Sequence, residues 1–108
     1  DSFVNAREDT RQRALRERQV EADRLLEDLR AALAQDGEAL LDAQERYCLH
    51  TALSELAAVR GATQDHRDLA RHIEGVAKAS EEFAARRMDN AVKRALAGHH
   101  LHDFDVGA

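Results

Sequence analysis

Apolar positions in the first third of the chain are spaced 7, 4, 3 and 4 residues apart, which is the pattern of one face of an amphipathic helix. The stripe consists of Leu15, Ala22, Leu26, Leu29 and Leu33. No Gly interrupts the chain before Gly37, and the sequence contains no Pro. The pattern therefore predicts one long helix over about 2–36. Apolar residues are sparse before Leu15, so we expect the start of this helix to project beyond whatever its later turns pack on.

Two further helices are predicted downstream. Asp42 and Glu45 have the spacing of a capping box, which places the start of a second helix at Asp42. Its stripe is Leu49, Leu53, Leu56 and Val59, and Gly61 is expected to end it, giving a helix over 42–60. A third helix, capped by Thr63 or Asp65, is predicted over 65–97. Its apolar positions are Leu69, Ile73, Val76 and Phe83, followed by Met88, Val92 and Leu96.

The connections at 37–41 and 61–64 are short, and short connections make neighbouring helices antiparallel. We therefore predict an all-α fold: a long N-terminal helix followed by a compact antiparallel helical bundle over 1–98, with a flexible tail over 99–108. Gly37 is expected to end the first helix in the left-handed conformation. Gly75, inside the third helix, should cost about 1 kcal/mol relative to Ala. The expected core is Leu26, Leu29, Leu33, Leu40, Leu49, Leu53, Leu56, Leu69, Ile73, Val76 and Phe83.

Composition and charge exclude several functions. Charged residues make up 34% of the chain and the net charge is −5, which argues against nucleic acid as a partner. No apolar run approaches the roughly 20 residues of a membrane span, and no secretory signal is recognisable. The single cysteine, Cys48, cannot form an internal disulfide, which fits a reducing cytoplasm. Because the chain starts at Asp1 without a Met, we expect it to be a segment of a longer protein.

The residue types that could catalyse a reaction or bind a metal do not form a recognisable site. His99, His100 and His102 lack a Cys or carboxylate placed to complete a metal site, so no metal is expected. We expect Cys48 to be an inert, half-buried thiol. No Ser–His–Asp set or phosphate-binding loop is present, so we predict that the chain is not an enzyme and holds no cofactor. Arg86, Arg87, Lys93 and Arg94 form a basic cluster, interpreted as a solvated helix end in preference to a site for an acidic partner.

Three groups of residues carry a resemblance to a known family. They are residues 83–89 (FAARRMD) with 94–99 (RALAGH), residues 19–22 (QVEA) with Leu25 and Leu26, and Asp1-Ser2 with Asn5-Ala6. Together they resemble the C-terminus of the HscA family of DnaK-type chaperones, over nearly the whole chain to about Asp103.

The resemblance implies that the chain is the helical lid of a substrate-binding domain, which closes over a bound peptide and slows its release. It implies a parent chaperone with an ATPase domain that uses ATP and Mg, and a β-sandwich that grips the peptide. The family acts in iron–sulfur cluster assembly on the scaffold protein IscU, with HscB as co-chaperone. None of these parts lies in the present sequence.

The resemblance also points to a latch between lid and sandwich. DnaK-type lids carry an acidic residue just before a Leu-Leu pair and a His just after it. These positions fall on Asp23 and Glu27, so the acid matches and the His does not. Asp23 is therefore expected to pair with a basic loop residue of the sandwich.

We also expect Phe3, Val4 and Val20 to be exposed without their family partners, which predicts a weak homodimer through the first helix. The alternative to a lid is a stand-alone helical adaptor that uses the first helix as a coiled-coil docking arm. The sequence upstream would distinguish the two: a lid follows a β-rich peptide-binding segment and a nucleotide-binding domain, whereas an adaptor has neither.

Overall fold

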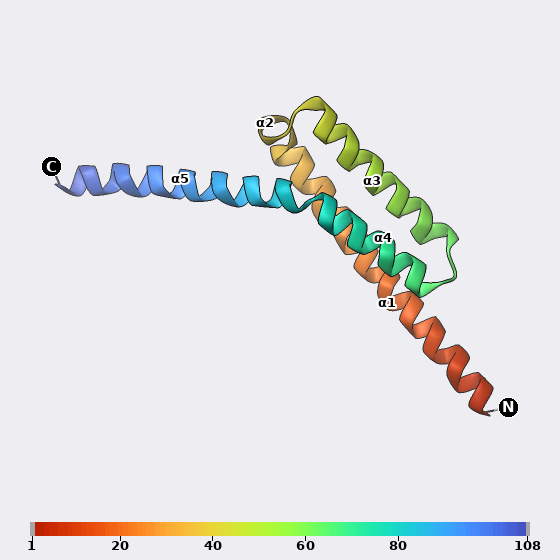
Figure 1. The fold of residues 1–108 in the computed structure, drawn as a ribbon. Helices are drawn as coiled ribbons and strands as arrows, with labels where there is room; N and C mark the ends of the chain where they lie inside the picture. The colour runs from red at the N-terminus through yellow and green to blue at the C-terminus, as the bar shows by residue number, and fades with distance from the viewer. Residues whose placement is uncertain (1, 108) are drawn as a thin grey trace.

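The first helix is long, as predicted. In the computed structural model, which describes the backbone of residues 2–107 and the side chains of 6–98, α1 runs without interruption over Ser2–Ala32. Every element within the described backbone is helical (Figure 1). The all-α fold class is confirmed, with a long N-terminal helix followed by helices that pack on it.

The helix does not end at Gly37, and this prediction was wrong. A π-helical turn, η1, spans Leu33–Gly37 and leads into the short α2, Glu38–Leu40. Gly37 keeps right-handed helical angles (φ −59°, ψ −46°), and the chain leaves the helix at Leu41, which is extended. A β-carbon on Gly37 would lie 3.3 Å from the Leu33 side chain. Glycine here relieves close packing inside a buried turn and does not provide a left-handed cap.

The second helix starts where the sequence predicts. α3 spans Ala43–Ala62, and both hydrogen bonds of the capping box form: Glu45 N–H donates to Asp42 Oδ1 (2.8 Å), and Asp42 N–H donates to Glu45 Oε1 (3.0 Å). Gly61 does not stop the helix, contrary to the prediction. The stop comes at Thr63, whose backbone is extended, because the segment that follows must turn back toward the bundle.

The third predicted helix is two helices. α4 spans His66–Ala79, and Asp65 caps it by accepting from the Arg67 N–H (2.9 Å). Ser80 then breaks the helix (φ −93°, ψ −3°): its buried hydroxyl donates to the Ala77 carbonyl (2.9 Å), a local bond that competes with regular helix geometry. α5 follows over Glu81–Gly107. Side chains beyond residue 98 lie outside the described residues, and the flexibility of the 99–108 tail stays a prediction.

The helices form a small bundle with two projections. α1, α3 and α4 pack on one another, with α3 antiparallel to both, while α5 leaves the bundle after its first turns and extends away from it (Figure 1). The N-terminal turns of α1 also project, as the sparse apolar pattern predicts. The molecule is consequently elongated, with extents of 78 × 32 × 17 Å.

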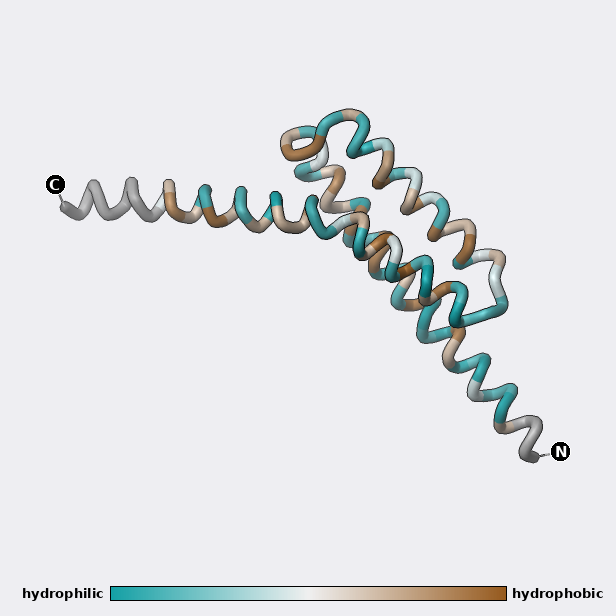
Figure 2. The backbone as a smooth tube through the Cα atoms, in the orientation of Figure 1, coloured by the Kyte–Doolittle hydropathy of each residue, from teal (hydrophilic) through white to brown (hydrophobic). Residues whose placement is uncertain are grey.

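The core lies between α1, α3 and α4, and Phe83 in the first turn of α5 joins it. Hydrophobic and hydrophilic positions alternate along these helices (Figure 2). Two residues predicted for the core, Leu29 and Leu40, are only half-buried, and Leu41 is buried instead. The change follows from the extra helical turns through Leu40, which move the end of the helix and turn the next leucine inward. The buried set is Ala22, Leu26, Ala32, Leu33, Leu41, Leu49, Leu53, Leu56, Leu69, Ile73, Val76 and Phe83.

Candidate functional site

The candidate latch residues lie on one exposed face of α1. Val20, Asp23 and Glu27 are spaced three and four residues apart, which places them on the same side of a helix. All three side chains are exposed, and Val20 is 50% accessible. The structure therefore brings the two predicted acidic residues together with one residue of the predicted self-association face. The side chains of Phe3 and Val4 lie outside the described residues.

Asp23 already has a partner inside the bundle. Arg60, in the last turn of α3, donates from Nε to Asp23 Oδ1 (2.9 Å) and from Nη2 to Oδ2 (3.0 Å). This bidentate ion pair joins α1 to α3 through two residues that are 37 positions apart in the sequence. It fixes the carboxylate on the α1 face. Because the carboxylate is 54% exposed, the pair contributes only about 0.2–1 kcal/mol to stability, and its oxygens stay accessible to a further donor.

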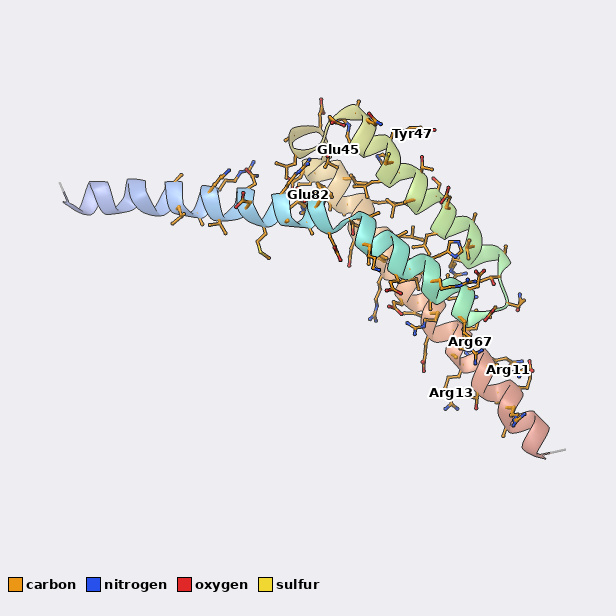
Figure 3. The ribbon with its side chains drawn as sticks, viewed as in Figure 1. Arg11, Arg13, Glu45, Tyr47, Arg67 and Glu82 are labelled. Atoms are coloured by element: carbon orange, nitrogen blue, oxygen red, sulfur yellow. The ribbon has the colours of Figure 1, made fainter. Side chains whose placement is uncertain are left out.

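A second charged site stands at the junction of α5 with the bundle (Figure 3, near the labels Glu45 and Glu82). We call it the elbow cluster: Asp36, Leu40, Glu45, Arg86 and Arg87. Arg86 donates from Nη1 to the Leu40 carbonyl (2.9 Å) and to Glu45 Oε1 (3.0 Å), and its Nη2 lies 2.9 Å from Glu45 Oε2. It thereby satisfies a carbonyl at the end of the first helical stretch and ties α5 to the start of α3.

Glu45 serves both the cap of α3 and the elbow. Hydrogen bonds from Arg86 hold the pKa of the Glu45 carboxyl below its ordinary 4.5, and the backbone hydrogen bond from Asp42 adds to this effect. The same contact raises the pKa of the Arg86 guanidinium, so both groups are charged at neutral pH. The helix start and the exit of α5 therefore depend on one carboxylate.

Arg87 fixes the other side of α5. Its Nε donates to Asp36 Oδ2 (2.8 Å), on the π-helical turn η1, and Nη2 reaches Gln35 Oε1 at 3.4 Å. Its guanidinium carbon lies 5.9 Å from the centre of the Phe83 ring, within cation–π range. The Asp36 side chain is only 17% exposed, so this ion pair is better shielded from solvent than the others at the surface.

The interpretation of the basic cluster as a solvated helix end was wrong for Arg86 and Arg87. The predicted pairs within α5 do form, Glu82 with Arg86 (3.4 Å) and Asp89 with Lys93 (3.8 Å). No local pattern in the sequence indicates the longer-range partners, because Glu45 and Asp36 lie 41 and 51 residues away. Arg60 was missed for the same reason.

Cys48 differs from its prediction. It is exposed on α3, since the buried face of this helix is taken by Leu49, Leu53 and Leu56. Among the side chains of residues 6–98, no three His, Cys, Asp or Glu are grouped to hold a metal ion. The imidazoles of His99, His100 and His102 are outside that range. Within the described part of the chain, no helix has the length and apolar character needed to cross a membrane.

The fold places the chain in the class of all-helical bundle modules. Its long first helix projects at one end, and its C-terminal helix leaves the bundle at the elbow cluster. Comparison with known proteins then gives the family. The chain is 48% identical over 106 residues to the chaperone protein HscA homolog of Azoarcus sp. strain BH72, covering 98% of this chain and 17% of that protein. No family model matches the chain.

Other relatives agree. The HscA homolog of Photobacterium profundum is 45% identical over 94% of this chain, and that of Burkholderia mallei strain SAVP1 is 49% identical over 96%. The chain covers 16% of the length of each. It belongs to the HscA chaperone family and corresponds to a C-terminal part of those proteins.

Proposed function

We propose that this chain is the non-catalytic lid of the substrate-binding domain of an ATP-dependent HscA-type chaperone. The observation that carries the proposal is the match of 92–98% of the chain to HscA homologs about six times as long. A module of this size, built as a bundle with a projecting arm, is suited to cover another domain and not to carry out chemistry of its own. The stand-alone adaptor becomes the weaker alternative, because the relatives continue well beyond the matched segment.

In this proposal the rest of the parent chain supplies the ATPase domain, with ATP and Mg, and the β-sandwich that holds the peptide. The parent works in the cytoplasm in iron–sulfur cluster biogenesis, with the scaffold protein IscU as client and HscB as co-chaperone. The present chain contributes closure: with the bundle docked over the sandwich, the peptide leaves more slowly.

The exposed α1 face is the proposed contact with the sandwich. Asp23 is the latch, and Arg60 positions its carboxylate through the two hydrogen bonds of 2.9 and 3.0 Å. Fixing the carboxylate in advance reduces the entropy lost when a basic loop residue of the sandwich binds to it. Glu27, one turn further along the same face, adds a second negative charge but cannot reproduce the chemistry of the His found there in DnaK-type lids.

The test of the lid is the release rate of a labelled IscU-type peptide from the ADP-bound parent chaperone, with and without the segment matching residues 1–108. Faster release after deletion, with basal ATPase activity intact, is the expected result. Equal release rates would contradict the lid and would bring the docking-arm alternative to first place.

The latch has its own test in the full-length parent. Asp23→Asn should speed peptide release by about tenfold, the size expected for one charge-assisted hydrogen bond. Asp28→Asn, the same change at another exposed position of α1, is the matched control and should leave release unchanged. If Asp23→Asn also has no effect while deletion does, the lid stands and the latch is wrong.

A further inference from the structure

α5 carries an apolar stripe that nothing in the described structure covers. Met88, Val92 and Leu96 are 71%, 50% and 61% exposed, and their spacing of four residues aligns them along one face. We call these three residues the α5 stripe. Isolated apolar side chains at a surface are ordinary, but three in register on a projecting helix form a surface suited to another helix.

The stripe faces away from the bundle. Phe83, Arg86 and Arg87 all contact the bundle side, and at about 100° per residue their common direction lies roughly half a turn from that of the stripe. Beyond these first turns α5 extends clear of the other helices (Figure 1). Val92 and Leu96 are therefore open to a second helix, while Met88, at the start of the stripe, lines an open hollow together with Gln35 and Asp36 of η1.

The residues flanking the stripe are of two kinds. On one flank are Asp89 and Lys93, whose side chains are 73% and 76% exposed and pair only within the helix, at 3.8 Å. On the other flank are the exposed alanines Ala84, Ala91 and Ala95, whose small side chains permit a close approach of two helix axes.

We propose that α5 is a homodimerisation surface, in which the stripes of two copies pack antiparallel about Val92. Like flanks meet in an antiparallel pair, so the charged flank of one copy faces that of the other. A register centred on Val92 sets Met88 opposite the second copy's Leu96 and brings each Asp89 beside the second copy's Lys93. The opposite charges then pair across the interface, and the alanine flanks close the other side.

A parallel pair would not have this complementarity, because the charged flank of one copy would face the alanine flank of the other. The proposal also differs from the homodimer predicted through α1, since it uses the opposite end of the molecule. It does not depend on the lid function, and it is tested on the chain itself.

The experiment is sedimentation equilibrium of chain 1–108 over a range of concentrations. The unchanged chain should show a concentration-dependent monomer–dimer equilibrium. Val92→Glu should raise the dimer dissociation constant by on the order of tenfold or more. The matched control is Ala97→Glu, which places the same charge on the opposite, exposed side of α5 and should leave dimerisation unchanged. Circular dichroism should show the same helicity for both variants.

The orientation of the helices is tested by mixing two charge variants. Asp89→Lys makes the flank all basic and Lys93→Asp makes it all acidic, so each variant alone should dimerise less than the unchanged chain. Mixed in equal amounts, the two should form heterodimers more readily than either forms homodimers, because opposite charges then meet only across the interface.

Three results would overturn the proposal. One is a monomer mass at every concentration. Another is a dimer that persists in Val92→Glu but is lost in Val20→Glu, which would assign self-association to α1. The third is the absence of heterodimer preference in the mixture, which would exclude the antiparallel register.

Discussion

The three-helix bundle and the elbow cluster hold their helices in different ways. In the bundle, Leu53, Leu56 and Leu69 are at most 1% exposed and belong to one apolar cluster. At the elbow, α5 is held by Phe83, which is buried in the core, and by two partly exposed arginines that reach partners more than 40 residues away. Apolar burial has little dependence on pH or salt, whereas partly exposed ion pairs depend on both.

This difference indicates that stability and shape are controlled separately. The bundle determines whether the chain folds, and the elbow determines the direction in which α5 leaves it. If the chain acts as a lid, the direction of α5 can change without unfolding the part that covers the peptide.

The largest effect is expected in the bundle core. Leu56→Ala removes a fully buried side chain and leaves a cavity, so the free energy of unfolding should fall by about 2–5 kcal/mol in urea denaturation. Leu96→Ala, on the exposed side of α5, is the matched control and should change it by less than about 0.5 kcal/mol. Similar losses for both would show that α5 is part of the same core.

The next largest effect is an increase in stability. Gly75 lies inside α4, and a β-carbon added there would meet no atom within 4 Å. Gly75→Ala should therefore raise the free energy of unfolding by about 1 kcal/mol, the helix-propensity difference. Gly37→Ala provides the contrast, because its β-carbon would lie 3.3 Å from the Leu33 side chain and should not stabilise the protein. A loss of stability in Gly75→Ala would contradict the open space described for this position.

Changes at the elbow should alter shape more than stability. Arg86→Ala removes the bonds to Glu45 and the Leu40 carbonyl, so the angle of α5 should become variable. Spin labels are attached at Ala58→Cys and Ala97→Cys in a Cys48→Ser background, and the distance between them is measured by pulsed electron paramagnetic resonance. In Arg86→Ala the distance distribution should change from narrow to broad. Lys93→Ala, which loses only a pair within α5, should keep it narrow. An unchanged distribution in Arg86→Ala would show that the remaining contacts, the Arg87–Asp36 pair and buried Phe83, are sufficient to orient α5.

Acid should loosen the elbow in the same way. Because contact with Arg86 lowers the folded-state pKa of Glu45, the stabilisation is complete above the ordinary value of 4.5 and is lost as the pH falls through the lower folded value. The distance distribution should broaden only below about pH 4.5. Glu45→Gln removes this titration and should give the same breadth across that range, so broadening that persists in Glu45→Gln would assign the effect to other carboxylates.

The sequence was sufficient for features that depend on neighbouring residues. The capping box at Asp42 and the stripe through Leu49, Leu53 and Leu56 follow from local spacing and were confirmed. Of the two predicted caps for the next helix, Thr63 and Asp65, the structure uses Asp65. The break at Ser80 was not predicted, because Ser is tolerated within helices and the apolar stripe continues through it to Phe83. The conformation of Gly37 was mispredicted because the helical path continues through η1 and α2 to Leu40, so this residue lies inside a turn and not at a helix end.

The candidate site could be predicted only in part from the sequence. The spacing of Val20, Asp23 and Glu27 places them on one face, and the structure keeps that face exposed. The partners Arg60, Asp36 and Glu45 could not be predicted, since pairing across 37 to 51 residues depends on how the helices cross. The Arg86-Arg87 pair belongs to the residues that carry the family resemblance, and the structure assigns it a role in fixing α5.

We infer that the bundle and α5 are separate cooperative units joined by the elbow cluster. Native-state hydrogen exchange of chain 1–108, at a concentration where it is monomeric, tests this most directly. Amides flanking Leu53, Leu56 and Leu69 should exchange only with the free energy of global unfolding, whereas those of residues 88–98 should exchange through a smaller opening that Arg86→Ala lowers further. Equal opening free energies in the bundle and in α5 would show that the two are one cooperative unit.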